Sequence, residues 1–427
     1  MQEKSHIHNS MFNVRWSPAN TRFAIILALL PLIFLISFVT LTAQPAHAQT
    51  YRRIYNFTDG LDGEYPNAGL TMDAEGNLYG TTWNGGRGCG TVFQLKHQGS
   101  NWVFNLLHEF TGGSDGCGPD GVIFGSNSTL YGTTGGGGNG FGTVFNLMPS
   151  ASGCKTALCP WTENVLYRFT GGLDGAYPGD LIFDEAGNIY GITALGGSYN
   201  GGVAYELTPS GSGYTETVIY NFGGVGDGFE PQSGLTFDNA GNLYGATWEG
   251  GDGYNNGTVF ELSPSGSGWA EKILYSFQGG NDGSLPFAGV IFDQSGNLYG
   301  ATSSGGTGGG GTVFEMSPSG EGWTFTVLYS FTGGFVSGPR ANLVMDGAGN
   351  IYGTTYGDGA YGKGSVFKLT PTSNPPWTYT SLHDFPLEGP DGAYPISNVT
   401  FDPSGNLYGT ATVGGSLGFG IVWEITP

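Results

Sequence analysis

The chain has 427 residues, of which 81 are glycine and 14 % are aromatic, while only 11 % are charged. This composition excludes a disordered chain, and 22 prolines without a three-residue glycine period exclude collagen. The formal net charge of −21 disfavours nucleic acids and anionic membrane surfaces as partners, because both need a basic footprint on the protein.

The N-terminal segment is typical of an export signal. Residues 1–22 are polar with net positive charge, an apolar run follows over residues 23–42, and Ala46-His47-Ala48 fits a small-x-small cleavage site. We predict a signal peptide over residues 1–48 and a mature domain over residues 49–427, which is secreted, periplasmic or at the cell surface. The apolar run is also long enough to span a bilayer, so an uncleaved membrane anchor is the alternative.

The mature region repeats one pentapeptide seven times. GNLYG stands at residues 76–80, 241–245, 296–300 and 405–409, GNIYG at 187–191 and 349–353, and STLYG at 128–132. Successive copies are 52 to 59 residues apart. A period of this size indicates stacked structural units that bury their apolar faces against one another.

Each unit contains four short segments with the composition of β-strands. In the fourth unit they are TETVIYNF (215–222), GLTFD (234–238), NLYGAT (242–247) and GTVFEL (257–262), separated by glycine-, proline- and asparagine-rich turns. Asp238 and Gly241 occupy the first and fourth positions of an expected type I turn. Four antiparallel strands in each of seven units predict an all-β fold, a seven-bladed β-propeller.

By analogy with propellers that carry similar segments, we expect GLTFD to be the inner strand, followed outward by NLYGAT, GTVFEL and TETVIYNF. The mature chain then starts with an outer strand, over residues 52–57, that has no blade of its own. It ends with three strands that lack an outer one. The N-terminal strand is therefore expected to complete the last blade and close the ring, which also removes exposed sheet edges.

The combined motifs resemble the GloVer tandem repeat, a family of secreted or surface-anchored bacterial proteins. The resemblance rests on GNLYGTT (76–82), GTVFELSPSG (257–266) and LYRFTGGLDG (166–175), and it covers residues 51–427. It implies an exported, propeller-like repeat protein. It implies no known activity and no catalytic residues.

Two sets of loops are expected on one face of the propeller, namely the outer-to-inner loops and the loops between the second and third strands. An Asp-Gly pair recurs in six of the outer-to-inner loops, at Asp62, Asp115, Asp174, Asp227, Asp282 and Asp391. These aspartates are either turn formers or a ring of ligands for Ca²⁺. We expect no other cofactor.

The same loops carry aromatic residues that are candidates for stacking on sugar rings: Trp83, Trp248, Tyr65, Tyr177 and Phe229. Their alternative role is packing within the loops. We therefore predict a monomeric binding module whose partner is an extracellular polysaccharide or a protein, without catalysis. The alternative is a carbohydrate-active enzyme, a glycosidase or lyase, using non-repeated acids of this face as its catalytic pair: Glu64, Asp120, Asp180, Glu230, Glu249 and Asp252.

Four cysteines lie in the first three units. Cys89 and Cys117 belong to loops expected on one face, and Cys154 and Cys159 share one loop on the opposite face. Because export permits disulfides, we predict the bonds Cys89–Cys117 and Cys154–Cys159.

Overall fold

The computed structural model describes residues 49–427, except residues 100, 150–160, 212, 224, 225, 233, 254, 267, 321, 387 and 388. The predicted leader over residues 1–48 lies outside the described residues, so it stays a prediction. Among the described residues, no helix has the length and apolar character needed to cross a membrane.

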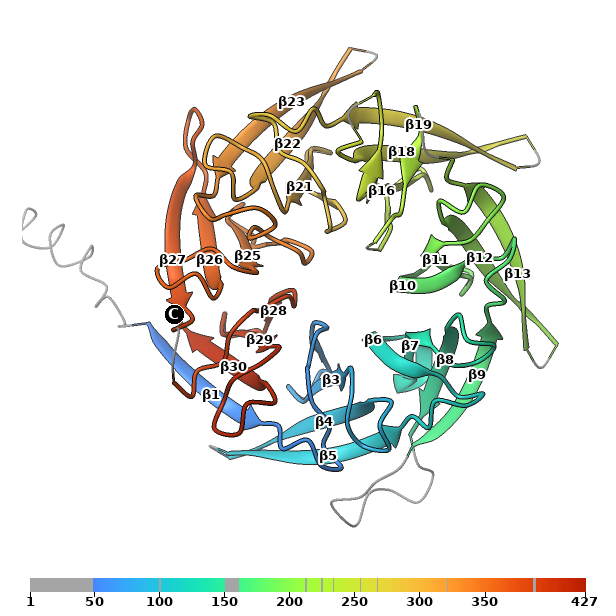
Figure 1. Cartoon of the computed structure of the whole chain (residues 1–427), viewed down its shortest axis with the longest axis vertical. Helices are drawn as coiled ribbons and strands as arrows, with labels where there is room; N and C mark the ends of the chain where they lie inside the picture. Colours follow the sequence, from blue (N-terminus) through green and yellow to red (C-terminus); the bar gives the residue numbers. More distant parts are fainter. Residues whose placement is uncertain are drawn as a thin grey trace, which may run out of the picture. The chain divides into compact units, whose positions relative to one another are not determined.

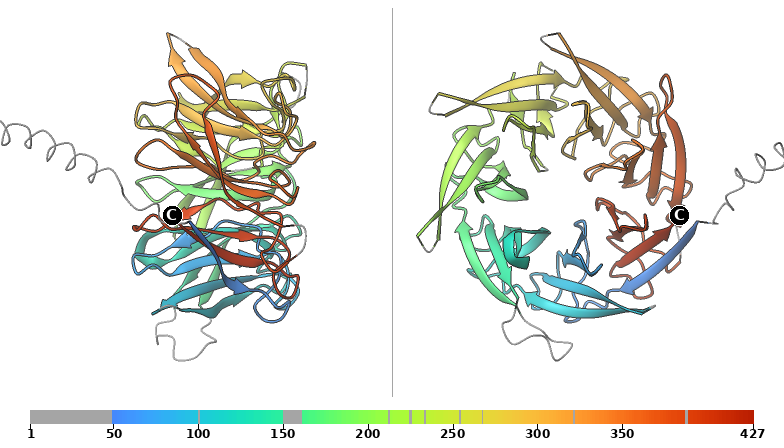
Figure 2. Two further views of the ribbon diagram at one scale, coloured as in Figure 1. Left: turned by 90° about the vertical axis from the view of Figure 1, so that its left-hand side faces the viewer. Right: turned by 180° about the vertical axis from the view of Figure 1, so that it is seen from behind.

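Seven four-stranded antiparallel sheets surround one axis, which confirms the predicted seven-bladed β-propeller (Figures 1 and 2). From the axis outward, blades 1 to 4 are built as follows. Blade 1 contains β2 (Thr71–Met72), β3 (Leu78–Thr82), β4 (Thr91–Gln98) and β5 (Asn101–Glu109). Blade 2 contains β6 (Cys117–Phe124), β7 (Leu130–Gly136), β8 (Thr143–Met148) and β9 (Thr162–Arg168). Blade 3 contains β10 (Ala176–Phe183), β11 (Ile189–Leu195), β12 (Val203–Ser210) and β13 (Gly213–Asn221). Blade 4 contains β15 (Thr236–Phe237), β16 (Leu243–Thr247), β18 (Thr258–Ser265) and β19 (Gly268–Ser276).

The remaining blades follow the same order. Blade 5 contains β20 (Ile291–Phe292), β21 (Leu298–Thr302), β22 (Thr312–Ser319) and β23 (Gly322–Ser330). Blade 6 contains β24 (Val344–Met345), β25 (Ile351–Thr355), β26 (Ser365–Thr370) and β27 (Thr378–Asp384). Blade 7 contains β28 (Thr400–Phe401), β29 (Leu407–Ala411), β30 (Ile421–Thr426) and β1 (Thr50–Asn56). In blade 4 the short strands β14 (Gly228–Phe229) and β17 (Glu249–Gly250) pair outside the main sheet, and blade 2 contains the 3₁₀ turn η1 (Ser126–Ser128).

The repeated pentapeptide is explained by one tight turn, seen clearly in blade 4. Oδ1 of Asp238 accepts the backbone N–H of Asn242 at 2.9 Å, and Oδ2 accepts the Asn242 amide at 2.8 Å and the Tyr244 hydroxyl at 3.2 Å. Gly241 supplies the positive φ of 86° that the turn requires, and Leu243 is fully buried. Although burial opposes it, the hydrogen bonds from Asn242 hold the pKa of Asp238 below its usual value.

The last glycine of the pentapeptide makes room for an aromatic side chain of the third strand. A methyl group added at Gly245 would lie 2.6 Å from Cζ of Phe260, which is fully buried. The Asp–Asn–Tyr turn recurs in six blades, and blade 2 lacks it because Gly125 replaces the aspartate.

Neighbouring blades are held together by a glycine that precedes each third strand. In blade 4 this residue is Gly257, with φ of 92°, and its carbonyl accepts the N–H of the buried Phe277 at 3.0 Å. A methyl group added at Gly257 would lie 2.5 Å from Cδ of Pro286 in blade 5. The same glycine–phenylalanine hydrogen bond occurs in all seven blades: Gly90–Phe110, Gly142–Phe169, Gly202–Phe222, Gly257–Phe277, Gly311–Phe331, Gly364–Phe385 and Gly420–Phe57.

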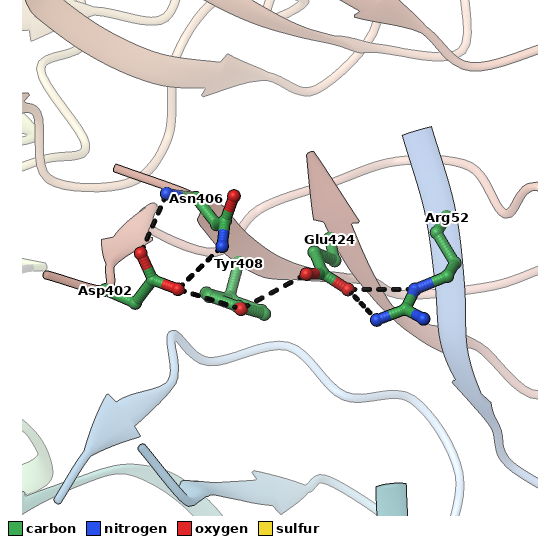
Figure 3. Close-up of polar contacts among 5 residues, drawn as sticks. All are labelled: Arg52, Asp402, Asn406, Tyr408 and Glu424. Carbon is green, nitrogen blue, oxygen red and sulfur yellow. Dashed lines mark hydrogen bonds and ion pairs between the residues drawn. The ribbon is translucent and has the colours of Figure 1, made fainter. Parts of the chain in front are cut away.

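The ring closes as the repeat phase predicted, because β1 pairs with β30 and completes blade 7. Arg52 donates from Nε to Oε2 of Glu424 at 2.9 Å and forms an ion pair with it. The other oxygen of Glu424 accepts the hydroxyl of Tyr408 at 3.2 Å, and Tyr408 also contacts the turn aspartate Asp402 at 3.3 Å. Figure 3 shows this chain of contacts, which links the N-terminal strand to the inner turn of the last blade, where Asn406 holds Asp402.

Replacing Arg52 with alanine is expected to lower the melting temperature more than replacing Arg53 with alanine. Loss of Arg52 leaves the nearly buried Glu424 carboxylate with one fewer donor, at a cost of about 1–3 kcal/mol. Arg53 is the matched control, because its Nε lies 3.7 Å from Asp391 near the surface. Thermal denaturation followed by circular dichroism measures both variants. Equal shifts would contradict a special role of Arg52 in ring closure.

A second prediction concerns the inter-blade glycine. Gly257→Ala is expected to be much more destabilising than Gly241→Ala, although both residues have positive φ. A methyl group at Gly241 meets no atom within 4 Å, so this variant carries only the backbone strain, about 1–2 kcal/mol. At Gly257 the methyl group also meets Pro286 and the carbonyl oxygen of Thr247, adding about 1–3 kcal/mol. Urea denaturation of the two variants tests the difference, and similar midpoints would refute it.

Candidate functional site

A pocket of about 750 Å³ lies on the axis of the propeller. All seven blades contribute to its wall through the segments that follow the repeated proline of each outer-to-inner loop. The first residue after that proline lines the pocket in every blade: Asn67, Asp120, Gly179, Gln232, Phe287, Arg340 and Ile396. Trp83 at the start of a second-to-third loop adds to the wall, as do Gly135 and Leu195 at the ends of the second strands β7 and β11, so the two loop sets do share one face, as the sequence predicted.

The proline itself explains why the next residue faces the axis. Pro286 is buried against Gly257, the inter-blade glycine of the preceding blade, and five of its counterparts make the same contact: Pro66, Pro119, Pro178, Pro231 and Pro395. A buried aliphatic residue, Val290 in this blade, then fixes the start of the inner strand. In the short segment between these two anchors, Phe287 faces the pocket while Ala288 is buried in the core.

Three polar side chains contact glycines of neighbouring blades at the axis: Asn398, Asn342 and Asp180. Asn398 lies against Gly69, where an added methyl group would stand 1.4 Å from Oδ1 of Asn398. Oδ1 of Asn342 accepts the N–H of Gly289 at 2.8 Å. The amide of Asn342 reaches Oδ2 of Asp180 at 3.4 Å, which links blade 6 to blade 3.

Acidic residues gather on one side of the pocket. Asp120, Asp180 and Glu230 come from three consecutive blades and all line it. Protein surrounds Asp120 within the channel, and this burial and the neighbouring Asp180 raise the pKa of Asp120 to about 7. Asp180 is exposed to the pocket, yet burial within the channel also raises its pKa, while the contact with Asn342 lowers it. The other three predicted acids of this face, Glu64, Glu249 and Asp252, do not line the pocket.

One basic residue, Arg340, lines the pocket from blade 6. Its guanidinium group lies 3.8 Å from the centre of the Tyr356 ring and donates to the carbonyl of Val336 at 3.1 Å. Burial lowers the pKa of Arg340, and Tyr356 acts in the opposite direction. The guanidinium group is therefore held in the wall by protein contacts of its own.

Two of the five predicted aromatic residues reach the pocket. Trp83 is 39 % exposed and lies over Gly118 and Gly135, while Tyr177 is 44 % exposed. The other three aromatic residues lie outside the pocket: Tyr65, Trp248 and Phe229. Sequence reasoning missed Asn67, Gln232, Phe287, Arg340, Asn342 and Asn398. The available signal was the position after the proline, which differs in every blade while its flanks repeat.

The Asp-Gly aspartates form turns. Oδ2 of Asp62 accepts the N–H of Thr58 and the hydroxyl of Tyr55, both at 3.0 Å, and Oδ1 accepts the hydroxyl of Thr58. Asp115, Asp174, Asp227 and Asp282 likewise accept the N–H four residues earlier. Within the described part of the chain, no three His, Cys, Asp or Glu side chains are grouped to hold a metal ion. The calcium site therefore stays a prediction without support from this geometry.

A disulfide between Cys89 and Cys117 joins a loop of blade 1 to the inner strand β6 of blade 2, which confirms that prediction. The adjacent Gly118 donates its N–H to the carbonyl of Cys89 at 2.9 Å. Because Cys117 and Gly118 line the pocket, the bond fixes part of its wall. The predicted Cys154–Cys159 bond lies outside the described residues.

Fold and pocket together define a β-propeller with one ligand-sized axial cavity among the described residues. The chain belongs to the Gloeobacter/Verrucomicrobia repeat family, whose model matches residues 40–252, 159–291 and 252–427. The curated proteins compared with it contain no match. The disulfide and this bacterial family indicate an extracellular or periplasmic protein.

Several solved structures share the fold at low sequence identity. The extracellular domain of a one-component system protein from B. thetaiotaomicron aligns with a TM-score of 0.50 and 11 % identity, over 87 % of this chain and 39 % of that one. PorZ, a surface component of the type-IX secretion system of Porphyromonas gingivalis, aligns with a TM-score of 0.48 and 14 % identity, over 83 % and 46 %. A protein described as a gluconolactonase aligns with a TM-score of 0.42 and 12 % identity, over 89 % and 92 %. These likenesses concern the fold alone.

Proposed function

We propose that this protein is an exported glycan-binding module, secreted or held at the cell surface, and that its binding site is the axial pocket. The observation that carries the proposal is the combination of Trp83 and Tyr177, two partly exposed aromatic rings, with amide and carboxyl groups in one cavity. A sugar ring has an apolar face and a rim of hydroxyl groups. Aromatic rings suit the face, and side-chain amides and carboxylates suit the rim.

The size of the pocket supports a short stretch of a glycan as the ligand. A cavity of about 750 Å³ lies within the range of small-molecule binding sites. The oxygen Oδ1 of Asn67 is buried in the wall and has no hydrogen-bond donor among the described residues. A buried acceptor without a donor is costly, so a ligand hydroxyl that donates to it would be favoured.

Glycan binding is expected to depend on Trp83. In a thermal-shift and calorimetry panel of laminarin, mannan, xylan, alginate and the oligosaccharides of chitin and chitosan, at least one should raise the melting temperature of residues 49–427. Trp83→Ala should weaken binding of that glycan about tenfold, because it removes a stacking surface. Tyr361→Ala is the matched control, since Tyr361 is 57 % exposed on a second-to-third loop outside the pocket. Glycan affinity that is unchanged in Trp83→Ala, or the absence of binding by every glycan of the panel, would contradict the proposal.

A second candidate function is hydrolysis of the bound glycan. The observation that favours it is the pair of carboxyl groups of Asp120 and Asp180, because the pKa of about 7 leaves Asp120 able to donate a proton near neutral pH. The neighbouring Asp180 would then serve as the carboxylate of a two-acid mechanism.

Hydrolysis predicts turnover that requires both acids. Reducing-end release from a bound oligosaccharide should be measurable between pH 5 and pH 8, and Asp120→Asn should lower it about 100-fold or more. Asp252→Asn should leave it unchanged, because Asp252 lies on the same face outside the pocket. A glycan that binds at the pocket and is never cleaved would leave binding as the sole function.

A further inference from the structure

The axial pocket carries more negative than positive charge, and this imbalance bears on its ligand. Asp120, Asp180 and Glu230 line one side, and Arg340 lines the wall opposite blade 3. These four, with the phenol of Tyr177, are the titratable side chains facing the cavity among the described residues. Burying like charges together is unfavourable unless an opposite charge joins them.

Described residues supply no ion-pair partner for these carboxylates. In the described part of residues 49–427, the ion pairs are Arg52–Glu424, Arg53–Asp391 and Arg87–Glu109, all outside the pocket. No described side chain or N–H group donates a hydrogen bond to Asp120, and Asp180 receives only the 3.4 Å contact from Asn342. The guanidinium group of Arg340 lies over the Tyr356 ring and donates to the carbonyl of Val336. The 3.4 Å contact from Asn342 to Asp180 is therefore the one hydrogen bond that described residues donate to the carboxyl groups of Asp120 and Asp180.

The charge state of Asp120 agrees with this description. Burial and the negative charge of Asp180 raise the pKa of Asp120 to about 7, so this carboxyl group is partly protonated in the free pocket near neutral pH. A positively charged ligand group beside Asp120 would offset the repulsion between the carboxylates of Asp120 and Asp180. An ammonium group is well suited, because it presents three donors and no acceptor.

We propose that the pocket recognises an amino sugar, with its protonated amine held between Asp120 and Asp180 and the apolar face of its ring against Trp83. This inference rests on the proposed glycan-binding function and names its substrate class. Trp83 and Tyr177 favour an amino sugar in two ways, because an aromatic ring attracts the C–H face of a sugar and also a nearby cation. The wall of the pocket also contains Oδ1 of Asn67, a buried oxygen that has no donor among the described residues.

The test compares three β-1,4-linked trimers that differ only at position 2: glucosamine, N-acetylglucosamine and glucose. Isothermal titration of residues 49–427 at pH 6.5 should give at least about tenfold tighter binding of the glucosamine trimer than of the other two, since one charge-assisted hydrogen bond to a carboxylate has this effect. In Asp120→Asn the ratio between the amine and the neutral trimers should fall to about threefold or less. Asp252→Asn, the control acid outside the pocket, should keep the wild-type ratio.

The outcomes separate this inference from the proposed function. Equal affinity for all three trimers, or tighter binding of a neutral one, would overturn amino-sugar recognition and leave glycan binding in place. Binding by none of the trimers and by none of the polysaccharides would overturn both. Trilysine binding as tightly as the glucosamine trimer would overturn the assignment to a sugar, because the site would then recognise ammonium groups regardless of the ring.

Discussion

The structure depends on one hydrogen bond that is made seven times, from the N–H of a buried phenylalanine to the carbonyl of the glycine before each third strand. In blade 4 that glycine is Gly257, at the end of the second-to-third loop. Because Gly257 has no side chain, Pro286 of the next blade can pack directly against its backbone. Gly257 thus joins the third strand to the outer strand through the hydrogen bond with Phe277, and to the neighbouring blade through its contact with Pro286. Only glycine fits this position, because both the positive φ and the close approach of proline exclude a side chain.

The pocket is a consequence of this packing. At six of the seven junctions the proline lies against the glycine before it, and the residue after the proline faces the axis in every blade. The blades need identical residues where they touch and can differ where they face the cavity. This division explains how a regular repeat yields an irregular pocket, with three acids on blades 2, 3 and 4 and a guanidinium group on blade 6.

The sequence was sufficient to predict the blades, their strand order and the closure of the ring. The blades follow from local rules, such as the turn of Asp238 and Asn242 and the period of the tyrosines. The strand order, and with it the closure of the ring, was inferred by analogy with propellers that carry similar segments. The Cys89–Cys117 bond was predictable because the repeat phase assigns both cysteines to one face. The pocket was only partly predictable, since Asp120 and Asp180 were recognised as non-repeated acids but could not be placed beside one another. Such proximity depends on where loops from separate blades meet.

Aromatic residues illustrate the same limit. Trp83 and Trp248 stand in equivalent loops, yet only Trp83 reaches the pocket. The backbone N–H of both tryptophans donates to a carbonyl at 3.0 Å, so this bond does not distinguish them. Trp83 lies over Gly118 and Gly135 of the next blade, whereas the corresponding residues in the blade after Trp248 are Leu285 and Ser303. Two identical residues in the same position of the repeat therefore have different roles.

The position after each proline has an evolutionary consequence. Seven residues from seven blades face a common space, and each is flanked by residues that maintain the scaffold. Each of these residues belongs to a different blade, so one position can be changed while the repeated residues of the scaffold are kept. Relatives with the same repeats and different residues at these seven positions would hold different ligands on an unchanged frame, and the same positions are a natural library for laboratory selection.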